Sequence, residues 1–186
     1  MSKTYTQCSP EIHKTARDIM HTHHPDLFAN EPSFLCIFVD AGIDEEGNPK
    51  PAIKHQGYPC AGIVKLTNAA DRACGKPDFV IQLDHQVWSR TEEEGRTSLL
   101  DHEITHVEPD LDEEGEYQVH SDGRPRLKMR RHDIEIGIFH EVIERHGAAA
   151  IDAVQVMNVY HSESGQAVFA FMEDLKTAGK KKRKAA

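Results

Sequence analysis

The sequence has no long apolar run, and this absence argues against a membrane-spanning protein. No stretch of its 186 residues approaches the roughly 18 apolar residues that a helix needs to cross a bilayer. The first residues, Met1–Tyr5, also lack the apolar core of a signal peptide, so we expect no secretion by that route. We therefore expect a cytoplasmic protein that has no membrane partner.

Cysteine is scarce and scattered, which argues against a disulfide framework. The four cysteines, Cys8, Cys36, Cys60 and Cys74, are widely spaced and form no C-x-x-C pair. In a protein of a reducing compartment such residues are reduced and mostly structural. A cysteine metal site is therefore disfavoured.

Positive charge is also in short supply. The chain has 22 Lys and Arg against 31 Asp and Glu, and its formal net charge is −9. A phosphate backbone would be repelled by this balance, so we do not expect general nucleic-acid binding. The exception is the basic run Lys180–Lys184, which could contact nucleic acid or act as a targeting signal. A solvated disordered tail is the simpler interpretation.

What is present suits one soluble globular domain. Apolar residues make up 38% of the chain and charged residues 28%, and the length is sufficient for a substantial core. We expect a single domain over residues 1–177, with its core at about 9–147 and a helical C-terminal extension over 148–177. A basic disordered tail would follow over 178–186.

The apolar pattern predicts an N-terminal helix and then three strands. The helix should span about Ser9 to His24, because Ser9 can cap it and Pro10 fits its first turn. The predicted strands are residues 34–39, 62–66 and 78–83, and residues 40–59 should form a loop.

A second helix should begin near Thr91, which with Glu94 forms the pattern of a capping box. We expect this helix to run to about Val107 and to end before Pro109. The sequence after this helix predicts a hairpin of residues 116–120 and 124–129, and then a helix over residues 133–146.

The second helix contains the motif His102-Glu103-Ile104-Thr105-His106. Imidazoles at positions i and i+4 project from one face of a helix and can bind one metal ion. The carboxylate of Glu103 would then lie beside any water that the metal binds. This pattern of residues is the minimum that zinc-assisted hydrolysis requires.

A catalytic zinc site also needs a third protein ligand and an open position. The first candidate is His132, which begins the next helix after a hairpin that could return the chain to the site. Glu135 or Glu141 would instead give a site of two histidines and one carboxylate, and His120 is the last candidate. The sequence leaves these alternatives open.

Four segments together resemble the putative phage metallopeptidase family, and more loosely other small zincin-like domains, including the SprT-like kind. They are Asp78-Phe79-Val80-Ile81-Gln82-Leu83, Trp88, Arg96 to His106, and Arg131-His132-Asp133-Ile134-Glu135 with Phe139. The resemblance covers about Phe34 to Gly147. It implies an α+β zincin-like domain, a bound zinc ion and a phage or prophage origin, hence the cytoplasm of a bacterial host. The expected fold is a three- to four-stranded sheet packed on the N-terminal helix and the motif helix, with a helical C-terminal part.

The expected activity is hydrolysis of peptide bonds in a protein or peptide substrate. Zinc on His102, His106 and His132 would activate a water, and Glu103 would act as general base. Tyr117 is one candidate donor to the oxyanion. The strand at 79–83 would lie at the sheet edge, where an extended peptide could pair with it. Two alternatives remain, a non-proteolytic binding protein of the same fold and a metal-dependent hydrolase or nuclease with another substrate.

Overall fold

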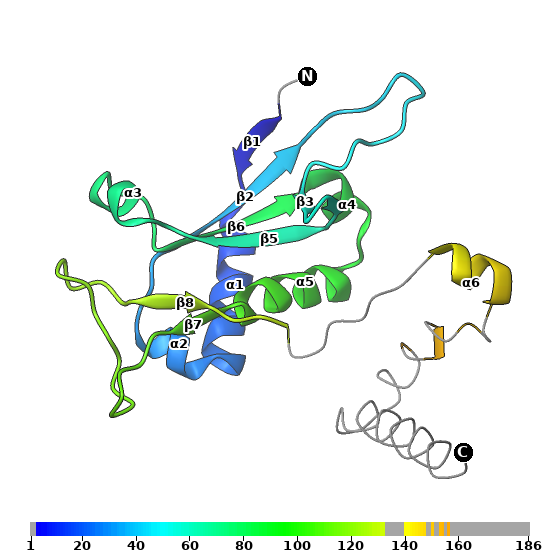
Figure 1. The fold of residues 1–186 in the computed structure, drawn as a ribbon. Coiled ribbons are helices and arrows are strands. Elements are labelled where there is room, and N and C mark those ends of the chain that lie inside the picture. The colour runs from blue at the N-terminus through cyan, green and yellow to red at the C-terminus, as the bar shows by residue number, and fades with distance from the viewer. Residues whose placement is uncertain (1–2, 133–139, 148–149, 151–152, 155, 157–186) are drawn as a thin grey trace, which may run out of the picture. The chain divides into compact units, whose positions relative to one another are not determined.

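A four-stranded mixed sheet is the centre of the structure, a computed structural model that describes residues 3–132, 140–147, 150, 153–154 and 156 (Figure 1). The chain divides into two compact units, residues 1–131 and 132–186. The first unit holds the sheet and the helices that pack on it. Helix α6 (His140–His146) belongs to the second unit.

The sheet has the strand order β1-β2-β6-β5. Its strands are β1 (Thr4–Gln7), β2 (Phe34–Asp40), β5 (Gly62–Leu66) and β6 (Phe79–Asp84). The two central strands, β2 and β6, run parallel, and each edge strand is antiparallel to its neighbour. Two short hairpins accompany the sheet, β3 (Lys54–His55) with β4 (Tyr58–Pro59) and β7 (Val107–Pro109) with β8 (Leu127–Met129). The fold is therefore α+β, as predicted, and is compatible with a small zincin-like domain.

Helices α1 (Pro10–His23) and α5 (Glu93–Thr105) pack on one face of the sheet (Figure 1). Side chains alternate between the two faces of a strand, so every second residue of β6 joins this core. The shared core is formed by Ala16, Ile19 and Met20 of α1, Leu100 and Ile104 of α5, and Phe79, Ile81 and Leu83 of β6. Burial of each large apolar side chain stabilises the fold by about 1.5–3 kcal/mol, and this core holds the motif helix against the sheet.

The segment that follows β2 packs against the end of that strand. Val39 of β2 forms a second, smaller core with Ala52 and Ile53. The carboxylate of Asp84, at the end of β6, accepts a hydrogen bond from the Ala52 backbone N–H at 2.7 Å. This long connection, predicted as loop, is therefore fixed to the sheet at its middle and contains the short β3–β4 hairpin.

The prediction that strand 79–83 lies at the sheet edge is wrong. Strand β6 pairs with β2 on one side and with β5 on the other, and β5 is the edge strand next to α5. Both strands are largely apolar, so their composition alone does not show which of them is paired on both sides. An extended peptide that added to this edge would pair with β5.

The predicted capping box at Thr91 is also wrong. A helix that was not predicted, α4 (His85–Arg90), ends at Thr91, whose hydroxyl donates to the Val87 carbonyl at 2.8 Å. Helix α5 begins at Glu93 after Glu92, which makes no capping hydrogen bond through its side chain. Two further short helices are α2 (Pro25–Ala29) and α3 (Ala69–Ala73).

The predicted hairpin of residues 116–120 and 124–129 is formed beside its turn but does not extend into β8. The turn at 121–123 is present, with a bridge between Val119 and Pro125. However, β8 pairs with β7, which directly follows the motif helix, rather than with residues 116–120. The apolar residues that make this pairing lie nearly twenty positions apart, and short-range turn signals do not report such pairs.

Several predictions fall on other parts of the chain. Most of the predicted extension at 148–177, the tail at 178–186 and residues 133–139 of the predicted last helix lie outside the described residues. The predicted division into one domain and a tail stays a prediction. Among the described helices, none combines the length and the apolar character that crossing a membrane requires.

Candidate metal centre

The motif lies in the last turn of α5. Leu100 and Ile104 are almost completely buried and anchor this turn on the sheet. His102 is exposed and His106 partly exposed, and their ring centroids lie 5.0 Å apart at an interplanar angle of 85°. The helix ends at Thr105, so His106 occupies the C-cap position. The two imidazoles therefore lie side by side at the end of the helix.

The chain returns to the motif through the β7–β8 hairpin. Val107 pairs with Met129, and the ladder continues for one more residue, where Arg130 N–H donates to the His106 carbonyl at 2.8 Å. Two residues later comes His132. One ligand atom from each of His102, His106 and His132 lies within 4.8 Å of the other two. The structure thus brings together the three histidines that the sequence predicted as metal ligands.

The ring of His106 is held in one orientation by the returning strand. Its Nδ1 lies 2.8 Å from the Arg130 carbonyl oxygen, which can only accept, so Nδ1 carries the proton. In the neutral imidazole this leaves Nε2 as the nitrogen that can bind a metal. Metal-binding histidines in proteins commonly make such a bond to a carbonyl oxygen.

The donor set fits a divalent transition metal. Three imidazole nitrogens suit zinc, copper, nickel or iron, and three protein ligands leave a position for water or substrate. Among the described residues, this is the group of histidine, cysteine and acidic side chains whose geometry could hold a metal ion. Residues 102, 106 and 132 would be its ligands.

Glu103 lies between the two motif histidines in sequence but faces the sheet. Its side chain is buried, with an exposed fraction of only 4%, and the Val64 backbone N–H of β5 donates to its carboxylate. Burial raises the pKa of Glu103 to about 7, against the opposing effects of the His106 charge and the Val64 hydrogen bond. A carboxyl group with this pKa can both accept and return a proton near neutral pH.

Gly62 makes room for this carboxylate and was not predicted from the sequence. A Cβ atom at position 62 would lie 2.8 Å from Glu103 Oε1, well inside the usual contact distance. Gly62 is the first residue of β5, where a glycine weakens a strand and commonly marks a close approach. A glycine at the start of a predicted strand was therefore a signal of close approach, but the sequence does not show that Glu103 is the residue that approaches.

Asp101 connects the motif to the N-terminal helices. Its carboxylate lies 2.7 Å from Nε2 of His24, the residue between α1 and α2. Asp101 immediately precedes His102, so this contact ties the last turn of α5 to the end of α1. The sequence showed histidines at the end of the first helix but gave no partner for them.

The other candidate residues are placed as follows. His120 contacts the guanidinium of Arg72 and is not part of the histidine group. Tyr117 donates its hydroxyl hydrogen to Asp26 of α2. Glu135 lies outside the described residues, as does the side chain of Glu141 in α6. Of the four alternatives for a third ligand, His132 is the one that the described structure places beside His102 and His106.

Comparison with known proteins identifies the family of this chain. The sequence model of the family described as "Putative phage metallopeptidase" matches residues 4–162, which include the sheet, the motif helix and His132. No curated protein and no solved structure matches the chain significantly.

Proposed function

Because the chain belongs to the phage metallopeptidase family, we propose that it is a zinc-dependent peptidase with Glu103 as its general base. The observation that carries the proposal is the grouping of His102, His106 and His132 within 4.8 Å at the end of the helix that also buries Glu103. A binding protein would have little use for a carboxyl group that is buried in the same helix turn as two histidines of this group.

The three histidines would hold the metal and leave one side open to solvent. A zinc ion held there would supply a Lewis acid that could polarise a peptide carbonyl and increase the acidity of water. The His106 orientation is set by the Arg130 carbonyl, so the Nε2 lone pair needs no rearrangement to bind. In this proposal the histidines hold the metal, and Glu103 transfers the proton.

Glu103 would take a proton from the attacking water and deliver it to the leaving amine. Its Oε1 lies 2.8 Å from where a Cβ at position 62 would be, so the carboxylate is held against the outer edge of β5. Burial raises its pKa to about 7, which increases its strength as a base while keeping proton return accessible. One carboxylate can therefore serve both steps.

Edge strand β5 would align the substrate. The carbonyl of Ala61 and the N–H of Thr67 are bonded toward β6, whereas the Val64 N–H points to Glu103. Backbone groups alternate in direction along a strand, so those of Gly62, Val64 and Leu66 face the outer edge. An extended peptide that paired there would pass beside Glu103.

The decisive experiment is Glu103→Gln, with zinc content and peptidase activity measured on the same preparations. The amide keeps the size of the side chain but cannot take a proton, so turnover should fall by about 10²–10⁴-fold while zinc is retained. Activity within a factor of a few of wild type would exclude Glu103 as the base. Wild-type protein that binds zinc but cleaves no peptide library would support the binding-protein alternative.

The third ligand is tested by His132→Ala. Loss of one imidazole from three should reduce the zinc affinity at least tenfold, measured by competition with a chelator. The matched control is His120→Ala, because His120 contacts Arg72 and lies outside the histidine group. Equal zinc affinity in the His132 variant and in wild type would remove His132 from the site.

A further inference from the structure

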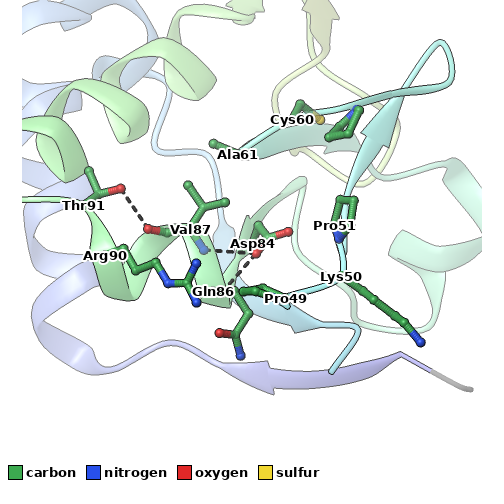
Figure 2. A pocket seen from close by; sticks show the side chains of 11 residues that line it. Pro49, Lys50, Pro51, Cys60, Ala61, Asp84, Gln86, Val87, Arg90 and Thr91 are labelled. Atoms are coloured by element: carbon green, nitrogen blue, oxygen red, sulfur yellow. Dashed lines mark hydrogen bonds between the residues drawn. The ribbon is translucent and has the colours of Figure 1, made fainter. Parts of the chain in front are cut away.

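A cavity of about 490 Å³ lies at the N-terminal end of β5, and neither the motif nor the proposed proton transfer uses it (Figure 2). Cavities of about 300–1,000 Å³ are typical of sites that bind small groups in proteins. Its walls are mostly apolar. They are formed by Pro49, Pro51, Pro59, Cys60, Ala61 and Val87. We call this cavity the β5 pocket.

The β5 pocket is next to the proposed catalytic group. Cys60 and Ala61 line it and directly precede Gly62, the residue against which Glu103 packs. The charges of Glu103 and Asp84 add to burial in raising the pKa of the Cys60 thiol, so the thiol lies near both carboxylates. A peptide paired along β5 would therefore carry one side chain into this pocket as it passes Glu103.

The walls of the β5 pocket are rigid before any ligand binds. Proline fixes its own backbone φ angle, and three of the wall residues are prolines. Asp84 connects two of the segments that surround the pocket. Its carboxylate accepts hydrogen bonds from the backbone N–H groups of Ala52, Gln86 and Val87 at 2.7–3.2 Å. A binding site of fixed shape loses less conformational entropy when it is filled.

Two cations stand on opposite walls. Figure 2 shows Arg90 beside Val87 and Gln86 on one wall, and Lys50 extending outward from the other. Lys50 also faces Asp44, whose pKa it helps to lower. Among the described residues, Arg90 has no ion-pair partner of its own. Asp84, the acidic residue of the lining, already accepts three backbone N–H groups.

We propose that the β5 pocket binds a glutamate side chain of the peptide substrate, with its methylene groups on the proline walls and its carboxylate against Arg90. This inference rests on the proposed peptidase function. An apolar stem matches the walls, and a terminal carboxylate matches the guanidinium, which binds carboxylates through paired hydrogen bonds. A shorter aspartate would reach the cation less well, and a lysine would meet the like charge of Arg90. The pocket would therefore select a glutamate at one position near the cleaved bond.

The test is a panel of peptides in which each position around the cleaved bond is in turn Glu, Gln, Leu or Lys. At one position wild type should favour Glu over Gln by about tenfold in kcat/KM, since only the carboxylate pairs with a guanidinium. Arg90→Glu should reverse this preference toward Lys, and Arg90→Gln should abolish it. The control Arg17→Glu makes the same charge change on α1, outside the pocket lining, and should leave the preference as in wild type.

Three results would overturn the proposal. They are equal rates for Glu and Gln at every position, a best rate for Leu, and an unchanged preference in both Arg90 variants. Binding of the same peptides to zinc-loaded Glu103→Gln, followed by fluorescence anisotropy, separates the pocket from the chemistry. If wild type cleaves nothing but this variant still binds Glu peptides best, the peptidase function fails and the pocket stands. Absence of any Glu preference in binding as well rejects the pocket.

Discussion

Two buried carboxylates, Asp84 and Glu103, flank the same end of strand β5, and they differ in how many backbone hydrogen bonds they accept. Asp84 has an exposed fraction of 1% and accepts three backbone N–H groups from two segments of chain. Glu103 is almost as buried, at 4%, but the one backbone hydrogen bond that lowers its pKa comes from Val64. Burial of a charged group is unfavourable unless hydrogen bonds replace the lost water.

The difference separates an acid that stabilises the fold from the acid that we propose as the general base. Asp84 is surrounded by donors that hold the loop at Ala52 and the start of α4 on the sheet. Glu103 is left short of donors, and its pKa rises to about 7, close to that of a base that works at neutral pH. A carboxyl group therefore stabilises the fold at one position, and at the other it would supply the general base of the proposed function. The three predictions that follow test this contrast, beginning with the largest effect.

Replacing Asp84 should damage stability and not the metal site. Asp84→Ala leaves three buried N–H groups without their acceptor, so the free energy of unfolding should fall by about 3–4 kcal/mol. The measurement is urea denaturation, with zinc content determined on the folded fraction. Asp44→Ala is the matched control, because Asp44 accepts two N–H groups in an exposed turn and should cost less than about 1 kcal/mol. Equal losses in the two variants would contradict the structural role of Asp84.

Replacing Glu103 should stabilise the metal-free protein, whereas replacing Asp84 should destabilise it. Its pKa rises from 4.5 in the unfolded chain to about 7 in the fold, so the folded protein holds a proton that the unfolded chain releases. Below pH 4.5 both states are protonated and burial of the group carries no electrostatic penalty. Between pH 4.5 and 7 the penalty grows, and above pH 7 it is about 3 kcal/mol, at about 1.4 kcal/mol for each tenfold change in proton affinity.

Glu103→Gln removes this penalty. In chelator-treated protein it should raise the unfolding free energy by about 3 kcal/mol at pH 8 and by almost nothing at pH 4.5, measured by denaturation across this range. A gain that does not depend on pH would show that the effect comes from packing rather than from ionisation. A loss of stability at pH 8 would remove the contrast with Asp84.

Filling the space at position 62 should disturb the chemistry more than the fold. In Gly62→Ala the new methyl group would lie 2.8 Å from Glu103 Oε1, so the carboxylate must move off its position beside Val64. Turnover should fall by about tenfold, while the unfolding free energy changes by less than about 1 kcal/mol. Gly95→Ala is the control, because its methyl group meets Thr91 instead and should leave turnover unchanged. Unchanged turnover in Gly62→Ala would show that the position of Glu103 is not critical.

Much of the fold was predictable because its elements depend on local pattern. Helix α1 carries Pro10 in its first turn and buries one regular apolar stripe, so its limits were predicted to within one residue. Strand β5 was predicted at its observed limits. The limits of helix α5 were harder to predict, because Glu103 occupies a core position between Leu100 and Ile104. A carboxylate there interrupts the apolar stripe, and Thr91, which was predicted to cap α5, instead bonds to the Val87 carbonyl at the end of α4.

The site was predictable where it is local and not where it depends on pairing over distance. His102, Glu103 and His106 were evident from their spacing, and His132 was proposed from its place after a hairpin. The bond from His106 to the Arg130 carbonyl, the contact of His24 with Asp101 and the space at Gly62 each join residues more than twenty positions apart. No periodicity encodes such pairs, because strand order and register decide them.

The return of the chain along β7 and β8 has a consequence for how this site can vary in evolution. In the described part of the chain, three residue pairs fix the register of that ladder, together with the Arg130 bond to His106 at one end and the Asp110 N–H bond to the Arg126 carbonyl at the other. The chain between, with its exposed turns at 112–116 and 121–123, can therefore lengthen or shorten without changing the approach to His132. We expect homologous sequences to differ widely in the distance from the second histidine of the motif to the third. Insertions there would reshape the surface around the site and leave its centre intact.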